Sequence, residues 1–392
     1  MWRSVLCRFF CVQISLFFIQ LIFVFPSWAL ENNPKGIAAI DPRLYQTQAA
    51  SEVKKGNYAR AVDLLQQALK QSSKSASLKQ NLSAALADWA RLLWDQKSIA
   101  DAADKLKQAV EADSKNGPAW FLMGDIAYLH QSDFKSAVLY WKKALPLAPS
   151  PIQKQIIERI SRAELDGHLE HGYVSITSTH FDVRFPSGFK KQEAERMSQY
   201  LEGEYAKFSR ELKINPPQLT LIIYEKQSFD RLTGAHDETL GLYDGRIRIG
   251  SREVHGPYES IILSHELAHA FLQHAFGNHL PIWIQEGYAQ AKEPVRILTE
   301  DQKRIEKELK SGTGWIPLKW LDRKFSQPAN LEDVSRSYLQ ARLTIAAILK
   351  KSVDGVGFQQ FLGRVSKGEP LKEAFEASFN GLSWNSIEYG RF

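Results

Sequence analysis

Apolar residues recur at the spacing of helix faces from about Tyr45 to His168, and no strand-like alternation interrupts this pattern. Alanines that stand seven residues apart recur in three places, namely Ala61 and Ala68, Ala102 and Ala109, and Ala137 and Ala144. The step from one pair to the next is 41 and then 35 residues. This internal repeat predicts stacked helix pairs, because paired small residues let two helices pack closely and bury one continuous core.

The repeated units resemble tetratricopeptide repeats. The matching residues are Gly56, Tyr58, Ala61 and Ala68 in the first unit, and Trp120, Gly124, Ala137, Ala144 and Pro149 in the third. The middle unit is about seven residues too long and lacks the glycine and the proline. The resemblance implies an all-α, tetratricopeptide-like domain over residues 45–168, with a degenerate middle repeat, a closing helix at about 152–168 and a protein partner for the repeats. A generic helical bundle is the alternative.

The pattern changes after Gly167. Strands are predicted at Tyr173–Phe185 (as strand, turn, strand), at Gln218–Tyr224 and, as a hairpin or bent strand with Asp244-Gly245 at its turn, at Leu240–Ile249. Helices are predicted at Glu193–Leu212, at about Tyr258–Phe276 and over most of the chain after Pro281. Strands first and helices after predict an α+β domain over residues 173–392.

The N-terminal residues differ from the rest of the chain. Arg3 and Arg8 precede an apolar run over residues 9–25, and small residues follow it. This order is typical of a secretory signal peptide over residues 1–29, cleaved after Ala29. The alternative is an uncleaved membrane anchor through residues 9–25.

Composition and charge narrow the classes of function. The hydrophobic fraction of 44% and the charged fraction of 24% are ordinary for a globular protein. The net charge of +6 is scattered, with isolated lysine doublets at 190–191 and 350–351, so we expect no nucleic-acid binding. Cys7 and Cys11 both lie in the N-terminal segment, so a cleaved protein would have neither a disulfide framework nor a thiol nucleophile.

Candidate chemistry is concentrated in the segment Ile261–Ala270, which reads IILSHELAHA. It contains the pattern H-E-x-x-H on a stretch whose length and periodicity predict a helix. His265 and His269 stand four residues apart, so both imidazoles project from one helix face and can bind one metal ion. Glu266 is one residue further along the helix and cannot bind the metal from the same place as the histidines. Its carboxylate can instead reach a water molecule in the open coordination position and act as a base.

Glu286 is the expected third metal ligand. A catalytic zinc site needs three protein ligands and one open position. Pro281 can start a second helix after a short link, and that helix would bring Glu286 back toward the two histidines. A buried carboxylate there needs a partner, and zinc is one. The alternative is a helix with two hydrogen-bonded histidines and an ion-paired Glu286.

The HELAH motif and the following PIWIQEGYA are similar to the peptidase-MA-like domain, a gluzincin group related to thermolysin and to the zinc aminopeptidases. The resemblance covers about Tyr173–Phe392 and includes QLTLIIYE, GLYDGRIRI and the ending FNGLSWNSIE. It implies an α+β zincin-like domain with a zinc ion held by His265, His269 and Glu286. It also implies that Glu266 is the general base and proton shuttle.

The resemblance further implies that Tyr338, which is expected to open the helix YLQARLTIAAIL, supports the oxyanion of the reaction. Other features depart from the family. Sixteen residues separate His269 from Glu286, about two fewer than in the zinc aminopeptidases. Gln290 stands where thermolysin-like enzymes have an aspartate that orients a histidine, so the orienting group has to come from elsewhere. The exopeptidase pattern G-x-M-E-N is absent, which favours an endopeptidase or a specialised activity.

Other ligands and other enzyme classes find less support. His274 falls on the opposite helix face and is expected at the surface, whereas His279 lies in the link and could approach the metal. Leu272 and Ala275 stand where the metzincin pattern needs glycine and histidine, which excludes that class. Nucleophile-elbow, Walker A and dinucleotide fingerprints are also absent from the sequence.

The expected function is therefore hydrolysis of peptide bonds by zinc-activated water in an exported protein, with the bacterial periplasm as the expected compartment. The edge strand of the sheet, expected at Gly241–Ile249, would align an extended peptide, and the repeats would recruit a substrate or partner. One alternative is a repeat-based scaffold or assembly factor with a vestigial or structural metal site. Hydrolysis of a non-peptide amide is not distinguishable from sequence.

Overall fold

The structure is a computed structural model that describes residues 42–391 except 97, 234–239, 252–256, 353–354 and 380–381. These residues form two compact units that divide between His171 and Gly172. The expected signal peptide or anchor at 1–29 lies outside the described residues. No described helix is both long and apolar enough to cross a membrane.

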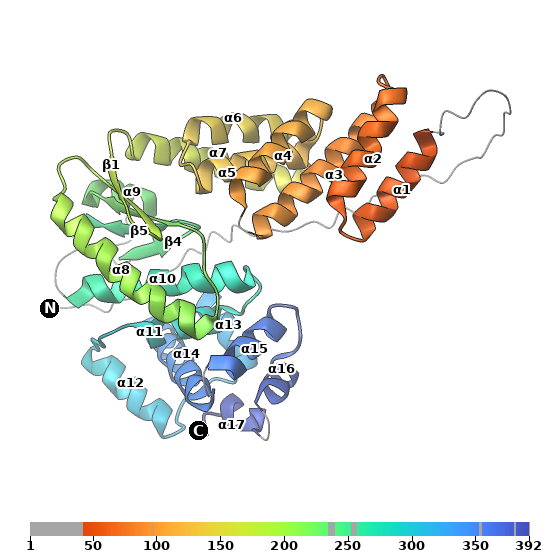
Figure 1. Ribbon diagram of the computed structural model, residues 1–392. Coiled ribbons are helices and arrows are strands. Elements are labelled where there is room, and N and C mark those ends of the chain that lie inside the picture. The colour runs from red at the N-terminus through yellow and green to blue at the C-terminus, as the bar shows by residue number, and fades with distance from the viewer. Residues whose placement is uncertain are drawn as a thin grey trace. The chain divides into compact units, whose positions relative to one another are not determined.

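The first unit is all helical and consists of helix pairs that stack along the chain (Figure 1). Its elements are α1 (Pro42–Lys54), α2 (Tyr58–Gln71), α3 (Ala76–Asp95), α4 (Ile99–Ala112), α5 (Gly117–Leu129), α6 (Phe134–Ala144), the short 3-10 helix η1 (Leu145–Leu147) and α7 (Ser150–Leu169). Helix α1 packs on α2, α3 on α4 and α5 on α6, as the repeat pattern predicts. The middle pair is long because α3 has 20 residues where α5 has 13.

Small residues permit the close packing of these pairs. The six alanines of the repeat pattern are buried. Gly124 on α5 lies against Trp141 on α6, and a Cβ atom at position 124 would come within 2.3 Å of the indole ring. The absence of a side chain at Gly124 therefore makes room for the fully buried tryptophan, and the pair fixes how α5 and α6 approach each other.

A buried charged pair ties α7 to α5 in this unit. The Arg159 guanidinium donates to Asp125 Oδ1 over 2.6 Å, and the Trp141 indole nitrogen donates to the same oxygen over 3.1 Å. Burial raises the pKa of Asp125 to about 6, although the charge of Arg159 and the hydrogen bond from Trp141 oppose this rise. The charge of each buried side chain is thus met by the other within the protein.

The second unit begins with a small mixed sheet whose strand order is β1-β2-β3-β5-β4 (Figure 1). The strands are β1 (Val174–Thr177), β2 (Phe181–Phe185), β3 (Leu219–Tyr224), β4 (Gly241–Tyr243) and β5 (Ile247–Gly250). Strands β2, β3 and β5 run parallel, while β1 and β4 pair antiparallel at the two edges. The expected hairpin at 240–249 is confirmed, with Gly245 at φ 98° in its turn.

Helices make up the rest of the second unit. They are α8 (Lys191–Leu212), α9 (Lys226–Thr233), α10 (Pro257–Phe276), α11 (Ile282–Lys292), α12 (Glu300–Lys310), α13 (Leu318–Ser326), α14 (Leu331–Lys351), α15 (Val356–Val365), α16 (Leu371–Ser378) and α17 (Trp384–Glu388). Helices α8 and α10 pack against each other and on the sheet, and α11 packs against both α10 and α14. At Gly287 of α11, a Cβ atom would come within 2.5 Å of the Ala341 carbonyl oxygen on α14. The absence of a side chain at Gly287 therefore lets α11 and α14 pack closely, and both helices carry residues of the site described next.

Candidate metal centre

Helix α10 is buried in the core of the second unit, yet it carries polar motif residues on one face. Leu263, Leu267, Ala268 and Phe271 are fully buried and belong to the same apolar core as the inner strands. The motif residues occupy the remaining face, so their side chains are themselves largely removed from water. Because residues four apart share a helix face, the two motif histidines lie one turn apart with their Nε2 atoms separated by 3.2 Å.

The third residue of the cluster comes from α11. This helix begins at Ile282 with Pro281 at its N-cap, as the sequence predicts. Its Glu286 carboxylate faces both imidazoles, with Oε2 3.6 Å from His265 Nε2 and Oε1 3.6 Å from His269 Nε2. The three residues offer ligand atoms within 4.8 Å of one another. The structure therefore brings together the three residues expected as metal ligands.

This donor set fits a zinc ion. Two imidazole nitrogens and one carboxylate oxygen form one of the usual ligand sets of catalytic zinc. Ligand atoms that surround zinc tetrahedrally at about 2.0–2.1 Å lie about 3.3–3.4 Å apart, close to the separations found between these atoms. Oε2 of Glu286 is buried without a hydrogen-bond partner in the described part of the protein, and no lysine or arginine there pairs with this carboxylate. A divalent cation would supply the missing positive charge.

Glu266 lies beside the cluster and is almost fully buried. Only 2% of its surface is exposed, and its Oε2 atom also has no hydrogen-bond partner among the described residues. Burial and the negative charge of Glu286 raise its pKa to about 8, against the opposing charge of His265. Strand β4 passes directly over this side chain, since a Cβ atom at Gly241 would lie 2.8 Å from Glu266 Oε1. The carboxylate thus stands between the edge strand and the three candidate ligands.

The two histidines have different electrostatic surroundings. Burial lowers the pKa of His269 to about 4. Burial acts in the same direction on His265, but the nearby carboxylates of Glu286 and Glu293 outweigh it and raise its pKa well above the ordinary value. A bound cation would change this balance, because it binds imidazole in the neutral form and favours loss of the proton.

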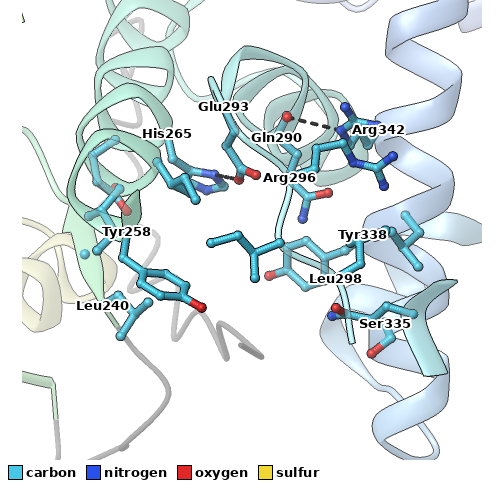
Figure 2. A pocket seen from close by; sticks show the side chains of 17 residues that line it. Leu240, Tyr258, His265, Gln290, Glu293, Arg296, Leu298, Ser335, Tyr338 and Arg342 are labelled. Carbon is cyan, nitrogen blue, oxygen red and sulfur yellow. Dashed lines mark hydrogen bonds and ion pairs between the residues drawn. The ribbon is translucent and has the colours of Figure 1, made fainter. Parts of the chain in front are cut away.

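Glu293 is a functional candidate that sequence reasoning missed. Its Oε1 atom lies 2.9 Å from His265 Nδ1 (Figure 2), whereas the other ring nitrogen, Nε2, faces the cluster. A carboxylate in this place fixes the orientation and tautomer of a metal-binding imidazole. Glu293 stands at the C-cap of α11, seven residues after Glu286, so both lie on one helix face. That spacing could have revealed it, but the family pattern directs attention to Gln290.

A pocket opens beside the cluster and is lined by both His265 and Glu266. Tyr258 of α10 and Tyr338 of α14 face each other across it (Figure 2). The prediction that Tyr338 opens its helix is wrong. Helix α14 begins at Leu331, because the Asn330 side chain accepts a hydrogen bond from the Asp333 backbone amide and caps the helix earlier. Tyr338 lies inside α14, half-buried, with its ring edge-on to Phe325.

The other histidines of this region lie outside the cluster. His274 is half-buried and not at the surface as expected, and its Nε2 atom is shielded from solvent. His279 is exposed in the link between α10 and α11. Neither contributes to the group of converging ligand atoms found in the described residues.

Comparisons with known proteins concern the first unit. Residues 87–150 match the family described as Tetratricopeptide repeat. The match begins in α3 and extends past η1, so it covers most of the second and third helix pairs. It confirms the repeat part of the sequence interpretation and indicates a protein-interaction scaffold. No curated protein matches the chain.

Proposed function

We propose that the protein is a zinc-dependent metallopeptidase of the gluzincin type, whose tetratricopeptide-like unit binds a protein substrate or partner. The observation that supports the second unit's activity is the convergence of His265, His269 and Glu286 beside the buried carboxylate of Glu266. A purely structural metal site has no use for that fourth residue. The small mixed sheet followed by helices is consistent with a zincin-like domain over residues 173–392.

The residues of the chain divide the work of peptide hydrolysis among them. Bound zinc would polarise the attacking water and the scissile carbonyl. Glu266 takes the proton of that water and later delivers it to the leaving nitrogen, a role that suits a buried carboxylate beside the metal ligands. Tyr338 donates a hydrogen bond to the oxyanion from the pocket wall.

Replacing Tyr338 by Phe should lower kcat by about a hundredfold, and Tyr258→Phe serves as the matched comparison.

Strand β4 offers the edge on which an extended substrate would be aligned. The sequence predicts an edge strand over the whole of 241–249, but β5 lies inside the sheet between β3 and β4. Of these two strands, β4 (Gly241–Tyr243) is the one at an edge of the sheet, and it lies next to Glu266. A peptide that adds to this edge by main-chain pairing would pass the cluster.

The first experiment measures zinc per chain in the wild type and in two variants. The wild type should hold about one zinc ion, Glu286→Ala should lose most of it, and Glu266→Gln should keep it but lose hydrolysis by about a thousandfold. Glu300→Ala, at an exposed carboxylate on α12, controls for a general loss of charge. Full hydrolysis by Glu266→Gln, or no zinc in the wild type after zinc is offered, would contradict the proposal.

A second function is favoured by the family match. The repeats indicate a scaffold, and the protein would then be an assembly factor with a vestigial or structural metal site. In that case Glu266→Gln would leave the function of the protein, including partner binding, unchanged, whereas loss of residues 45–165 would abolish partner binding. If the enzyme reading holds, the same deletion should slow cleavage of the native substrate while a short peptide is still hydrolysed.

The compartment and the scissile bond are also part of the proposal. We expect an exported protein of the bacterial periplasm, either cleaved after Ala29 or anchored through residues 9–25. Mass spectrometry of the N-terminus of the purified protein distinguishes the two. Assay of peptides beside simple non-peptide amides tests whether the bond hydrolysed is a peptide bond.

A further inference from the structure

Arg342 is a cation of the pocket wall that neither the cluster nor its supporting carboxylate uses. It lies on α14, one turn after Tyr338, and lines the same pocket as His265 and Glu266. Its Nε atom donates to the Gln290 backbone carbonyl over 3.3 Å, which positions the side chain (Figure 2). No carboxylate among the described residues lies within ion-pair distance of its guanidinium. An arginine has five N–H donors, and the hydrogen bond to Gln290 uses one of them, so the others have no acceptor among the described residues.

The surroundings of Arg342 set it apart from the other arginines near the pocket. It is half-buried, and burial followed by the nearby charge of Arg296 lowers its pKa, against the opposing charges of Glu293 and Glu306, neither of which pairs with it directly. Arg296 itself pairs with Glu306 over 2.8 Å, so its charge is met within the protein. An arginine keeps its charge even when burial opposes it. The wall of the pocket therefore holds the fixed positive charge of Arg342, positioned by a backbone contact.

We propose that Arg342 binds a carboxylate group of the substrate. The guanidinium presents parallel N–H donors that match the two oxygens of a carboxylate, and a half-buried site strengthens that pairing. Figure 2 shows the two arginines on the side of the pocket opposite Leu240 and Tyr258. A peptide lying between β4 and α14 would thus place a carboxylate against α14. This inference rests on the proposed function for the identity of the occupant as a peptide.

The carboxylate has two sources in a peptide. It is either an acidic side chain near the scissile bond or the free C-terminus itself, and the pocket chemistry is shared by both. A purely structural role for Arg342 is the competing explanation, since its contact with the Gln290 carbonyl joins α14 to α11. The two explanations differ in one respect, because a structural role does not create a preference for negative charge in a ligand.

Four matched dipeptide hydroxamates test the proposal on the zinc-loaded, two-unit protein by isothermal titration calorimetry. The hydroxamate anchors each probe, and the probes differ in carrying Glu or Gln and a free or amidated C-terminus. We expect at least one anionic probe to bind about tenfold more tightly than the neutral probe, as a charge-assisted pairing implies. A preference that follows Glu identifies an acidic side chain, and one that follows the free terminus identifies a terminal carboxylate.

Variants assign the preference to Arg342. Arg342→Gln should bring the anionic and neutral probes within about twofold of each other, while Arg342→Lys should keep part of the preference because it retains the charge without the planar fork. Arg304→Gln, an exposed arginine on α12 that pairs with Glu308, is the matched control and should leave the preference intact. Equal or undetectable binding of all four probes, or a preference that survives Arg342→Gln, overturns the inference.

The outcome is separable from that of the proposed function. Binding of the probes does not require hydrolysis. A charge preference that depends on Arg342, in a protein without peptidase activity, would therefore support the carboxylate site and contradict the proposed peptidase function. Peptide hydrolysis by an enzyme that binds anionic and neutral probes with equal affinity would support the peptidase function and contradict the carboxylate site.

Discussion

The two units of the molecule bury charged side chains in opposite ways. In the repeat unit, the carboxylate of Asp125 meets the guanidinium of Arg159 directly, and the indole of Trp141 adds a further hydrogen bond. In the second unit, the carboxylates of Glu266 and Glu286 are buried with no lysine or arginine paired to them in the described chain. The first arrangement pairs opposite charges within the protein, although Asp125 Oδ2 and Arg159 Nε have no hydrogen-bond partner among the described residues, and the second has no such pairing with a lysine or arginine in the described chain.

This difference separates structural charges from charges arranged for a ligand. A buried ion pair that is satisfied within the protein contributes to how helices fit together and needs nothing from solution. Buried acids that face two imidazoles have a large desolvation cost that only protonation or an external cation relieves. The comparison predicts that cations and protons affect the two units differently, and that each effect can be removed by one substitution.

Arg159→Met should have the largest effect, and only on the repeat unit. The substitution leaves Asp125 buried without a counter-charge, so the free energy of unfolding of this unit should fall by about 3–5 kcal/mol. Urea denaturation followed by hydrogen exchange in α5, α6 and α7 measures it. Adding Asp125→Asn should recover much of the loss. Unchanged stability in Arg159→Met would mean that the pair is not a structural tie.

The second prediction concerns pH and the same carboxylate. The pKa of Asp125 in the folded protein is about 6, above its ordinary value of 3.8, so the folded state binds the proton more tightly. Its contribution to stability is therefore fully present below about pH 4 and is lost as the pH rises through 6. Two pKa units correspond to a change on the order of 3 kcal/mol.

Comparison with Asp125→Asn isolates this contribution, since asparagine does not titrate. The free energy of unfolding of the repeat unit should decline between pH 4 and pH 7 in the wild type relative to the variant. Denaturation curves of both proteins across this range provide the measurement. A constant difference between them would show that Asp125 titrates normally.

Zinc should act on the second unit alone. When free zinc exceeds its dissociation constant a hundredfold, the gain in stability is about 2.7 kcal/mol. Hydrogen exchange should slow in α10 and α11 and stay unchanged in α5 and α7. Glu286→Ala should abolish the effect. Equal protection in both units on adding zinc would indicate nonspecific binding and break the comparison.

Local sequence patterns were sufficient for those parts of the structure that depend on spacing within one element. The four-residue spacing of His265 and His269 placed both on one face of α10, and Pro281 marked the start of the helix that returns Glu286. The repeat of paired alanines placed the helix pairs of the first unit. In each case the information lies in residues that are close in the chain.

Features that depend on how distant segments meet could not be derived in this way. The parallel pairing of β2, β3 and β5 has no mark in the strands themselves, and the short helix α9 was not predicted. Arg342 becomes notable only because α14 folds against the Gln290 segment. Helix α14 starts at Leu331, before the expected start at Tyr338, because the Asn330 side chain caps it there, ahead of the apolar run that marks the helix in the sequence.

Glu293 carries the last and smallest prediction, because it supports the candidate metal centre without contacting the expected ion. Glu293→Gln keeps an oxygen that can accept from His265 Nδ1 but removes the charge, so zinc affinity should fall about tenfold. Glu293→Ala removes both and should approach a hundredfold loss. Competition with a zinc-binding dye measures these affinities, with Glu300→Gln as the exposed control. If Glu293→Ala bound zinc as tightly as the wild type, the carboxylate would resemble the satisfied charges of the repeat unit, and its contact with His265 would be structural.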